Sequence, residues 1–143
     1  MGSTSELGSS TNNIDSEIAE LEKEKERLAK IGKELQTKKK EYEELITKLE
    51  QLISSLRATL DSVSNAKAAF EGGGYSNDGI TLDNGDLTKK SSEIETDIDV
   101  LEIVIEKCNY KLEEIAEDIE ENSSAYTKVS NALTTKRRLR DLG

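Results

Sequence analysis

The sequence predicts an all-α protein in which two long helices fold back on each other as an antiparallel two-helix coiled-coil hairpin with a Gly-rich central turn. Apolar residues recur at alternating spacings of three and four in two long stretches, three consecutive glycines separate these stretches, and the 143 residues include no proline. Charged residues make up 35% of the chain and aromatic residues 3%, which is typical of long helices packed along a narrow seam. A net charge of -10 would also suit a disordered chain, but the periodicity argues against disorder.

The first helix is predicted over residues 13–71. Residues 1–12 are mostly small and polar and are expected to form a disordered tail, and Asn13 is a suitable N-terminal cap. The single domain then covers residues 13–143. Its first seam, which is far more apolar than the 34% hydrophobic content of the whole chain, comprises Ile14, Ile18, Leu21, Lys25, Leu28, Gly32, Leu35, Lys39, Tyr42, Ile46, Leu49, Ile53, Leu56, Leu60, Val63, Lys67 and Phe70.

The turn segment is predicted over residues 72–86. Gly72, Gly73 and Gly74 end the first helix because glycine accepts the left-handed conformation of a C-terminal cap and costs about 1 kcal/mol inside a helix. Tyr75 opens a polar run that contains Asn-Gly and leaves room for a short β-like excursion. The aspartates of this run lack the order of an EF-hand loop, so turn and cap roles are expected for them.

The second helix is predicted over residues 87–140, with Asp86 as its N-terminal cap. Basic residues from Lys136 onward suit the negative end of this helix and are interpreted as a solvated helix end. The second seam comprises Leu87, Ser91, Ile94, Ile98, Leu101, Ile105, Cys108, Leu112, Ile115, Ile119, Asn122, Tyr126, Val129 and Leu133.

Antiparallel pairing with Phe70 opposite Leu87 gives two arms of matching length. In this register Gly32 is expected to lie beside Tyr126, so that a large side chain fills the space left by the glycine.

The helices also carry apolar residues that the seam does not use. These residues, which we call the apolar band, are Leu45, Leu52, Val100, Ile103 and Val104. Exposed apolar surface of this kind usually marks an interface. We therefore expect a helix from a second copy or from a different protein to pack on the band and complete a bundle.

Composition disfavours catalysis, and we expect no enzyme activity, cofactor or metal. The chain has no histidine, which is the commonest general base and zinc ligand, and its one cysteine, Cys108, is expected to be a seam residue. The negative charge disfavours nucleic acid as a partner. No apolar run approaches the roughly 20 residues of a membrane helix, and the first residues do not resemble a signal peptide. Membrane insertion is not expected, and the protein is predicted to be cytoplasmic before any export.

Two short motifs carry information beyond the seam pattern. Phe70-x-Gly72 stands at the turn, and Tyr110-x-x-x-Glu114 lies on the second helix, where Tyr110 should face solvent. A helical hairpin with these motifs resembles the WXG100-like proteins of type VII secretion systems, and its length and Phe-Glu-Gly-Gly-Gly-Tyr turn are similar to those of the small helical accessory proteins of LXG-domain toxins. The resemblance implies an adaptor that binds the toxin's N-terminal helical domain, together with a second small helical protein, and presents a composite signal that includes Tyr110 and Glu114 to the secretion ATPase.

Two other classes of protein share this architecture. Prefoldin-like chaperone subunits are helical hairpins with β structure at the bend, although residues 75–86 have room for at most one very short β-hairpin. A homodimeric coiled-coil scaffold is the other alternative.

Overall fold

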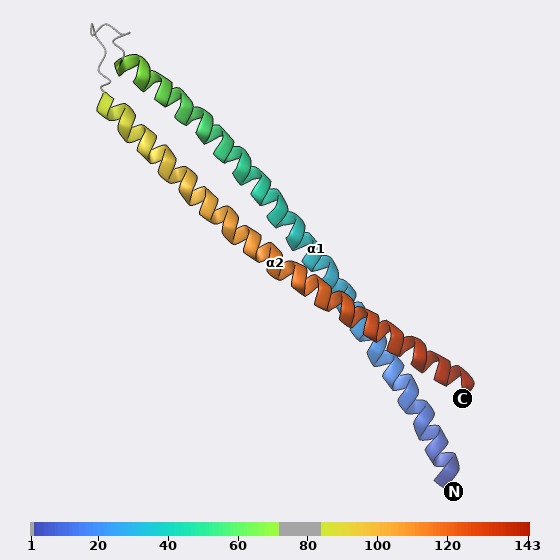
Figure 1. Ribbon diagram of the computed structural model, residues 1–143. Coiled ribbons are helices and arrows are strands. Elements are labelled where there is room, and N and C mark those ends of the chain that lie inside the picture. Colours follow the sequence, from blue (N-terminus) through green and yellow to red (C-terminus); the bar gives the residue numbers. More distant parts are fainter. Residues whose placement is uncertain (1, 72–83) are drawn as a thin grey trace. The chain divides into compact units, whose positions relative to one another are not determined.

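The computed structural model describes residues 2–71 and 84–143, and for residues 2–12, 71 and 84 it describes the backbone alone. Its elements are α1 (Gly2–Glu71) and α2 (Asn84–Leu142) (Figure 1). The two helices pack against each other in opposite directions. The prediction of an all-α helical hairpin is therefore confirmed.

The helix ends differ in part from the prediction. α1 ends at Glu71, as predicted, but begins at Gly2, so the backbone of residues 2–12 is helical in the structure and Asn13 lies inside the helix rather than at its cap. Proline, the residue that most strongly prevents a helix from continuing, is absent from this region. α2 begins at Asn84, which places Asp86 in its first turn rather than at the cap. Gly72, Gly73, Gly74 and Tyr75 lie outside the described residues, as does the predicted β-like excursion.

The helical pair divides into two compact units, and each unit contains part of both helices. We call Glu41–Leu112 the central unit, and Met1–Lys40 with Glu113–Gly143 the terminal unit. The sequence predicted a single hairpin domain and gave no indication that the helical pair divides into two units.

The core of the central unit is formed by three buried isoleucines, Ile53 from α1 and Ile94 and Ile98 from α2. Partly buried residues of both seams surround them: Leu56, Leu60, Val63, Leu101 and Ile105. An ion pair joins the helices beside this core, with 2.7 Å between Arg57 Nη2 and Glu102 Oε1. The predicted seam is thus the packing surface of this unit.

The terminal unit has its own buried seam residues, Ile18 and Leu28 from α1 and Ile115 and Leu133 from α2. The predicted seam is confirmed here as well. Among the predicted residues of the two seams, Lys39 alone is exposed.

The basic end of α2 pairs with acidic residues of α1. Lys136 Nζ lies 2.6 Å from Glu17 Oε2, and Arg137 Nη2 lies 3.0 Å from Glu22 Oε1. These lysine and arginine side chains therefore connect the two helices as well as facing solvent at a helix end.

Polar residues on α1 also find partners in the terminal unit. The Lys25 ammonium lies 5.5 Å from the centroid of the Tyr126 ring, which is within the range of a cation–π contact. Arg27 Nε donates a hydrogen bond of 3.0 Å to Glu24 Oε2, and this bond holds the pKa of Glu24 below its ordinary value. Lys25 therefore occupies its seam position by placing its charge over an aromatic ring.

Candidate partner-binding surface

The apolar band lies entirely within the central unit, and both helices contribute to it. Leu45 and Leu52 of α1 are 40% and 47% exposed, and Val100 and Ile103 of α2 are 52% and 51% exposed. Val104 is half-buried. The predicted exposure is confirmed for Leu45, Leu52, Val100 and Ile103, and the role of the band in binding remains a prediction.

Helix geometry explains why these residues are exposed. Leu52 precedes the seam residue Ile53 by one position, and Val104 precedes Ile105 by one position, so each points about 100° away from its neighbour in the seam. Arg57 and Glu102 instead follow seam residues. The ion pair and the apolar band therefore lie on opposite flanks of the seam.

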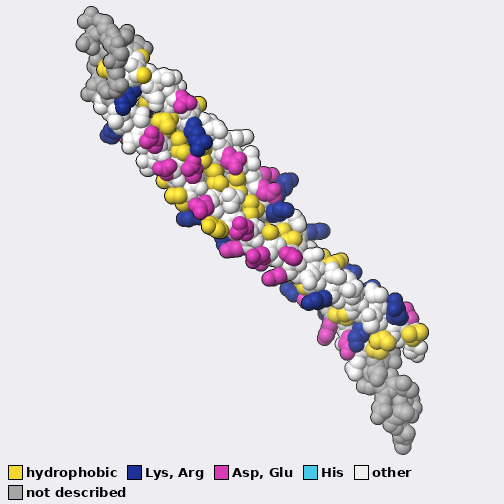
Figure 2. Space-filling model, viewed as in Figure 1, with side chains coloured by type: hydrophobic (Ala, Val, Ile, Leu, Met, Phe, Trp, Pro, Cys, Tyr) yellow, Lys and Arg dark blue, Asp and Glu magenta, His cyan; other side chains and the backbone are white. Residues whose placement is uncertain are grey.

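The surroundings of the band are strongly charged. In Figure 2, hydrophobic side chains run along the central unit with acidic side chains gathered around them. On α2, Asp99 and Glu106 border Val100 and Ile103 and are exposed. An apolar strip with a charged border has the composition of a docking surface, with an apolar centre and a polar rim.

The two motifs are placed differently in the structure. Phe70 is half-buried in the last turn of α1, and its glycine partners lie outside the described residues. Tyr110 is 59% exposed, as predicted. Glu114 is also exposed and takes part in an interaction of its own. The structure thus leaves the Tyr110 ring accessible to another protein.

The described residues form no metal site and no membrane span. Within residues 2–71 and 84–143, no three His, Cys, Asp or Glu side chains are grouped so that they could hold a metal ion. Cys108 is buried in the seam. Over the same residues, neither helix has a stretch sufficiently long and apolar to span a bilayer.

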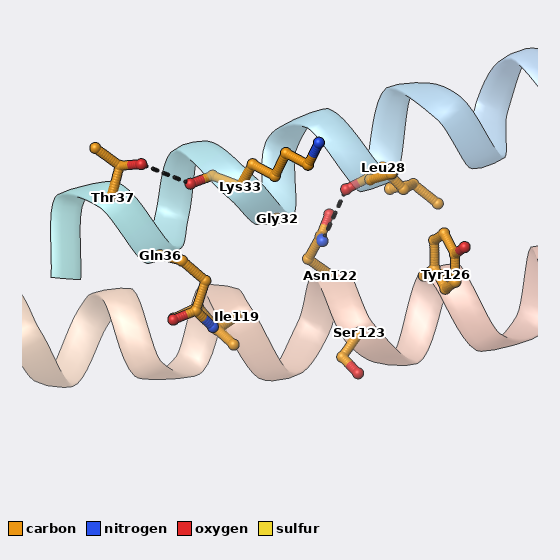
Figure 3. A pocket seen from close by; sticks show the side chains of 10 residues that line it. Leu28, Gly32, Lys33, Gln36, Thr37, Ile119, Asn122, Ser123 and Tyr126 are labelled. Carbon is orange, nitrogen blue, oxygen red and sulfur yellow. Dashed lines mark hydrogen bonds between the residues drawn. The ribbon is translucent and has the colours of Figure 1, made fainter. Parts of the chain in front are cut away.

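A polar contact between the helices in the terminal unit was not predicted. Asn122 Nδ2 donates a hydrogen bond of 3.0 Å to the Leu28 carbonyl, beside Gly32 (Figure 3). A Cβ on Gly32 would lie 3.1 Å from Asn122 Nδ2. The expected pairing of Gly32 with Tyr126 is therefore wrong, because Asn122, one turn earlier in α2, occupies the space beside the glycine. The sequence contained a signal for this contact, because Asn122 is a polar residue in an otherwise largely apolar seam and needs a hydrogen-bond partner there.

This contact predicts that the effect of Gly32→Ala depends on Asn122. In an Asn122→Ala background we expect Gly32→Ala to raise the free energy of unfolding by up to about 1 kcal/mol, because alanine is the better helix former. With Asn122 present, the new methyl group displaces the Asn122 side-chain amide from its hydrogen bond. The increase in the free energy of unfolding caused by Gly32→Ala should then be smaller by about 0.5–1.5 kcal/mol. Urea unfolding of the four proteins of this double-mutant cycle measures the difference. Equal effects in the two backgrounds would contradict the contact.

Comparison of the chain with models of known protein families, with curated proteins and with solved structures finds no match.

Proposed function

We propose that the protein is a non-enzymatic adaptor that binds the N-terminal helical domain of an LXG-type toxin and promotes its export by a type VII secretion system. The observation that carries this proposal is the apolar band, which lies exposed on the central unit. A helical pair with an apolar strip on one flank can receive a further amphipathic helix.

Burial of the band supplies a sufficient driving force. Its four most exposed members are each about half exposed. Full burial of a Val, Leu or Ile side chain contributes about 1.5–3 kcal/mol, so covering the exposed halves of four side chains contributes on the order of 3–6 kcal/mol. This gain is large enough to orient a partner helix, with the remaining affinity coming from contacts around it.

The resemblance to type VII accessory proteins supplies the class of partner. In this proposal the band covers an apolar face of the toxin's helical domain before export, while the protein is in the cytoplasm. A second small helical protein joins the complex, and the exposed Tyr110 forms part of the surface that the secretion ATPase reads.

The test is to charge the band in a cell that produces the toxin. We expect Leu52→Glu combined with Val104→Glu to abolish co-purification of the protein with its larger helical partner, because the two carboxylates would be buried without partners in the interface. Circular dichroism should show that helicity persists, since neither residue belongs to the buried core. Mass spectrometry of the captured partner identifies its class.

The matched control adds the same charge elsewhere. Ser54 and Asn109 are exposed in the same unit, and their positions in the repeat are not on the flank that carries the band. Ser54→Glu combined with Asn109→Glu should leave the complex intact. The interface assignment fails if the band variant still binds the partner, and the functional assignment fails if the captured partner is not a secreted toxin.

A further inference from the structure

A second row of residues with seam-like spacing runs along the outer side of α2. We call it the outer stripe, and its members follow one another at spacings of 4, 3, 4, 3 and 4: Glu93, Asp97, Val100, Val104, Lys107 and Lys111. All of them are exposed except Val104, which is half-buried. Alternating spacings of three and four are the pattern by which one helix packs along another. α2 therefore has one such row in the hairpin seam and another on its surface.

The charges of the outer stripe are arranged about its apolar centre. Two acidic residues precede the valines and two lysines follow them. Along the chain the order is acid, acid, valine, valine, lysine, lysine. An antiparallel copy presents the opposite order, so each acid meets a lysine and each valine meets a valine. The stripe is thus its own complement in an antiparallel arrangement, whereas a parallel arrangement would place acid against acid and lysine against lysine.

We propose that a second copy of this chain docks on the outer stripe, with α2 antiparallel to α2 of the other copy across a two-fold axis. In this arrangement Val100 lies against Val104 of the second copy, Asp97 against Lys107, and Glu93 against Lys111. Each contact occurs twice, as the symmetry of such a dimer requires. Ile103, which is 51% exposed and lies beside the valines, is covered in the same contact.

The first helix fits the same arrangement. The Arg57–Glu102 ion pair places this part of α1 at the level of the two-fold axis on α2. Leu52 is 47% exposed on the same flank of the seam as Val104, so a second copy that docks on this flank can cover it as well.

Charge complementarity is the reason to assign a second copy rather than an unrelated helix. Glu93 already has Lys90 on its own helix at 4.0 Å, and exposed ion pairs of this kind contribute little to stability. Across an interface, opposite charges mainly select orientation and partner, and like charges brought together strongly disfavour association. A pattern that complements itself at one register therefore selects its own copy.

The dimer does not depend on the proposed secretion function. The two proposals share one surface, however. A partner helix that binds the apolar band must displace the second copy, so partner binding and dimerisation would compete. The protein alone is sufficient to test the dimer, so failure of one proposal leaves the other standing.

Charge reversal in the purified full-length protein tests the pairing of Asp97 with Lys107. Sedimentation equilibrium should give a dimer of the 15.8 kDa chain. Asp97→Lys, and separately Lys107→Asp, should each raise the dissociation constant of the dimer at least about 10-fold, because each places like charges at two symmetric contacts. An equimolar mixture of the two variants should form a heterodimer, since every contact between them again joins opposite charges.

Glu95→Lys is the matched control, because Glu95 is exposed on α2 and follows the seam residue Ile94, which places it on the flank opposite the outer stripe. It makes the same change in net charge and should leave the dimer intact. A native protein that stays monomeric overturns the proposal, as does a control that dissociates like Asp97→Lys. If both single variants are helical but their mixture forms no heterodimer, the antiparallel pairing is wrong.

Discussion

Replacement of Ile53 by alanine is expected to lower the free energy of unfolding of the central unit by about 2–5 kcal/mol. Ile53 is 6% exposed and joins Ile94 and Ile98 in the core of that unit. The change removes buried methyl and methylene groups and leaves a cavity that two helices can only partly close. Because the net stability of a domain is only about 5–15 kcal/mol, this loss is a large fraction of the total.

Leu52→Ala is the control for this prediction, since the two residues are neighbours on α1. Leu52 is 47% exposed, so its truncation should cost less than about 1 kcal/mol. Urea unfolding followed by circular dichroism measures both variants at concentrations at which the protein is a monomer. Equal losses for Leu52→Ala and Ile53→Ala would mean that the seam does not pass through Ile53.

Leu133→Ala should have a comparably large effect on the terminal unit, again about 2–5 kcal/mol. Leu133 is the most completely buried side chain among the described residues, with 2% of its surface exposed. Leu139→Ala, six residues further along α2, is the control. Leu139 is 48% exposed, so its truncation should lower the free energy of unfolding only slightly.

The location of this loss can be measured as well as its size. Side chains in a helical pair contact mainly their neighbours along the pair, so local opening can differ between regions. Amide hydrogen exchange should show reduced protection in residues 13–40 and 113–142 of Leu133→Ala, with protection retained around Ile53 and Ile98. A uniform loss along both helices would show that the chain unfolds as one cooperative unit.

Much of the architecture was predictable from periodicity. Thirty of the predicted seam residues are buried or half-buried in the structure, and the exception, Lys39, is a lysine that can reach water from a seam position. The exposure of Leu52, Val100 and Tyr110 was predictable for the same reason. Leu52 and Val100 each precede a seam residue by one position, and Tyr110 lies midway between the seam residues Cys108 and Leu112, so none of the three points into the seam. A repeat of this length determines which side of each helix is buried.

The pairing of individual residues was not predictable in the same way. A seam with spacings of three and four looks almost the same after a shift of one helical turn, so Gly32 could be matched with Tyr126 or with Asn122. Apolar packing discriminates weakly between these registers. The hydrogen bond from Asn122 to the Leu28 carbonyl, in the space that Gly32 leaves open, identifies the pairing in the terminal unit.

The sequence by itself determined that this chain forms two amphipathic helices, which side of each is buried, and where the apolar band lies. Those properties depend on the helical repeat, which is set by residues that are close together in the sequence. Tertiary structure alone decided the partners of Asn122, Lys25 and the basic end of α2, and the division into two units. These depend on distances between residues remote in the sequence, and a repeating pattern carries little information about which of its equivalent turns will meet.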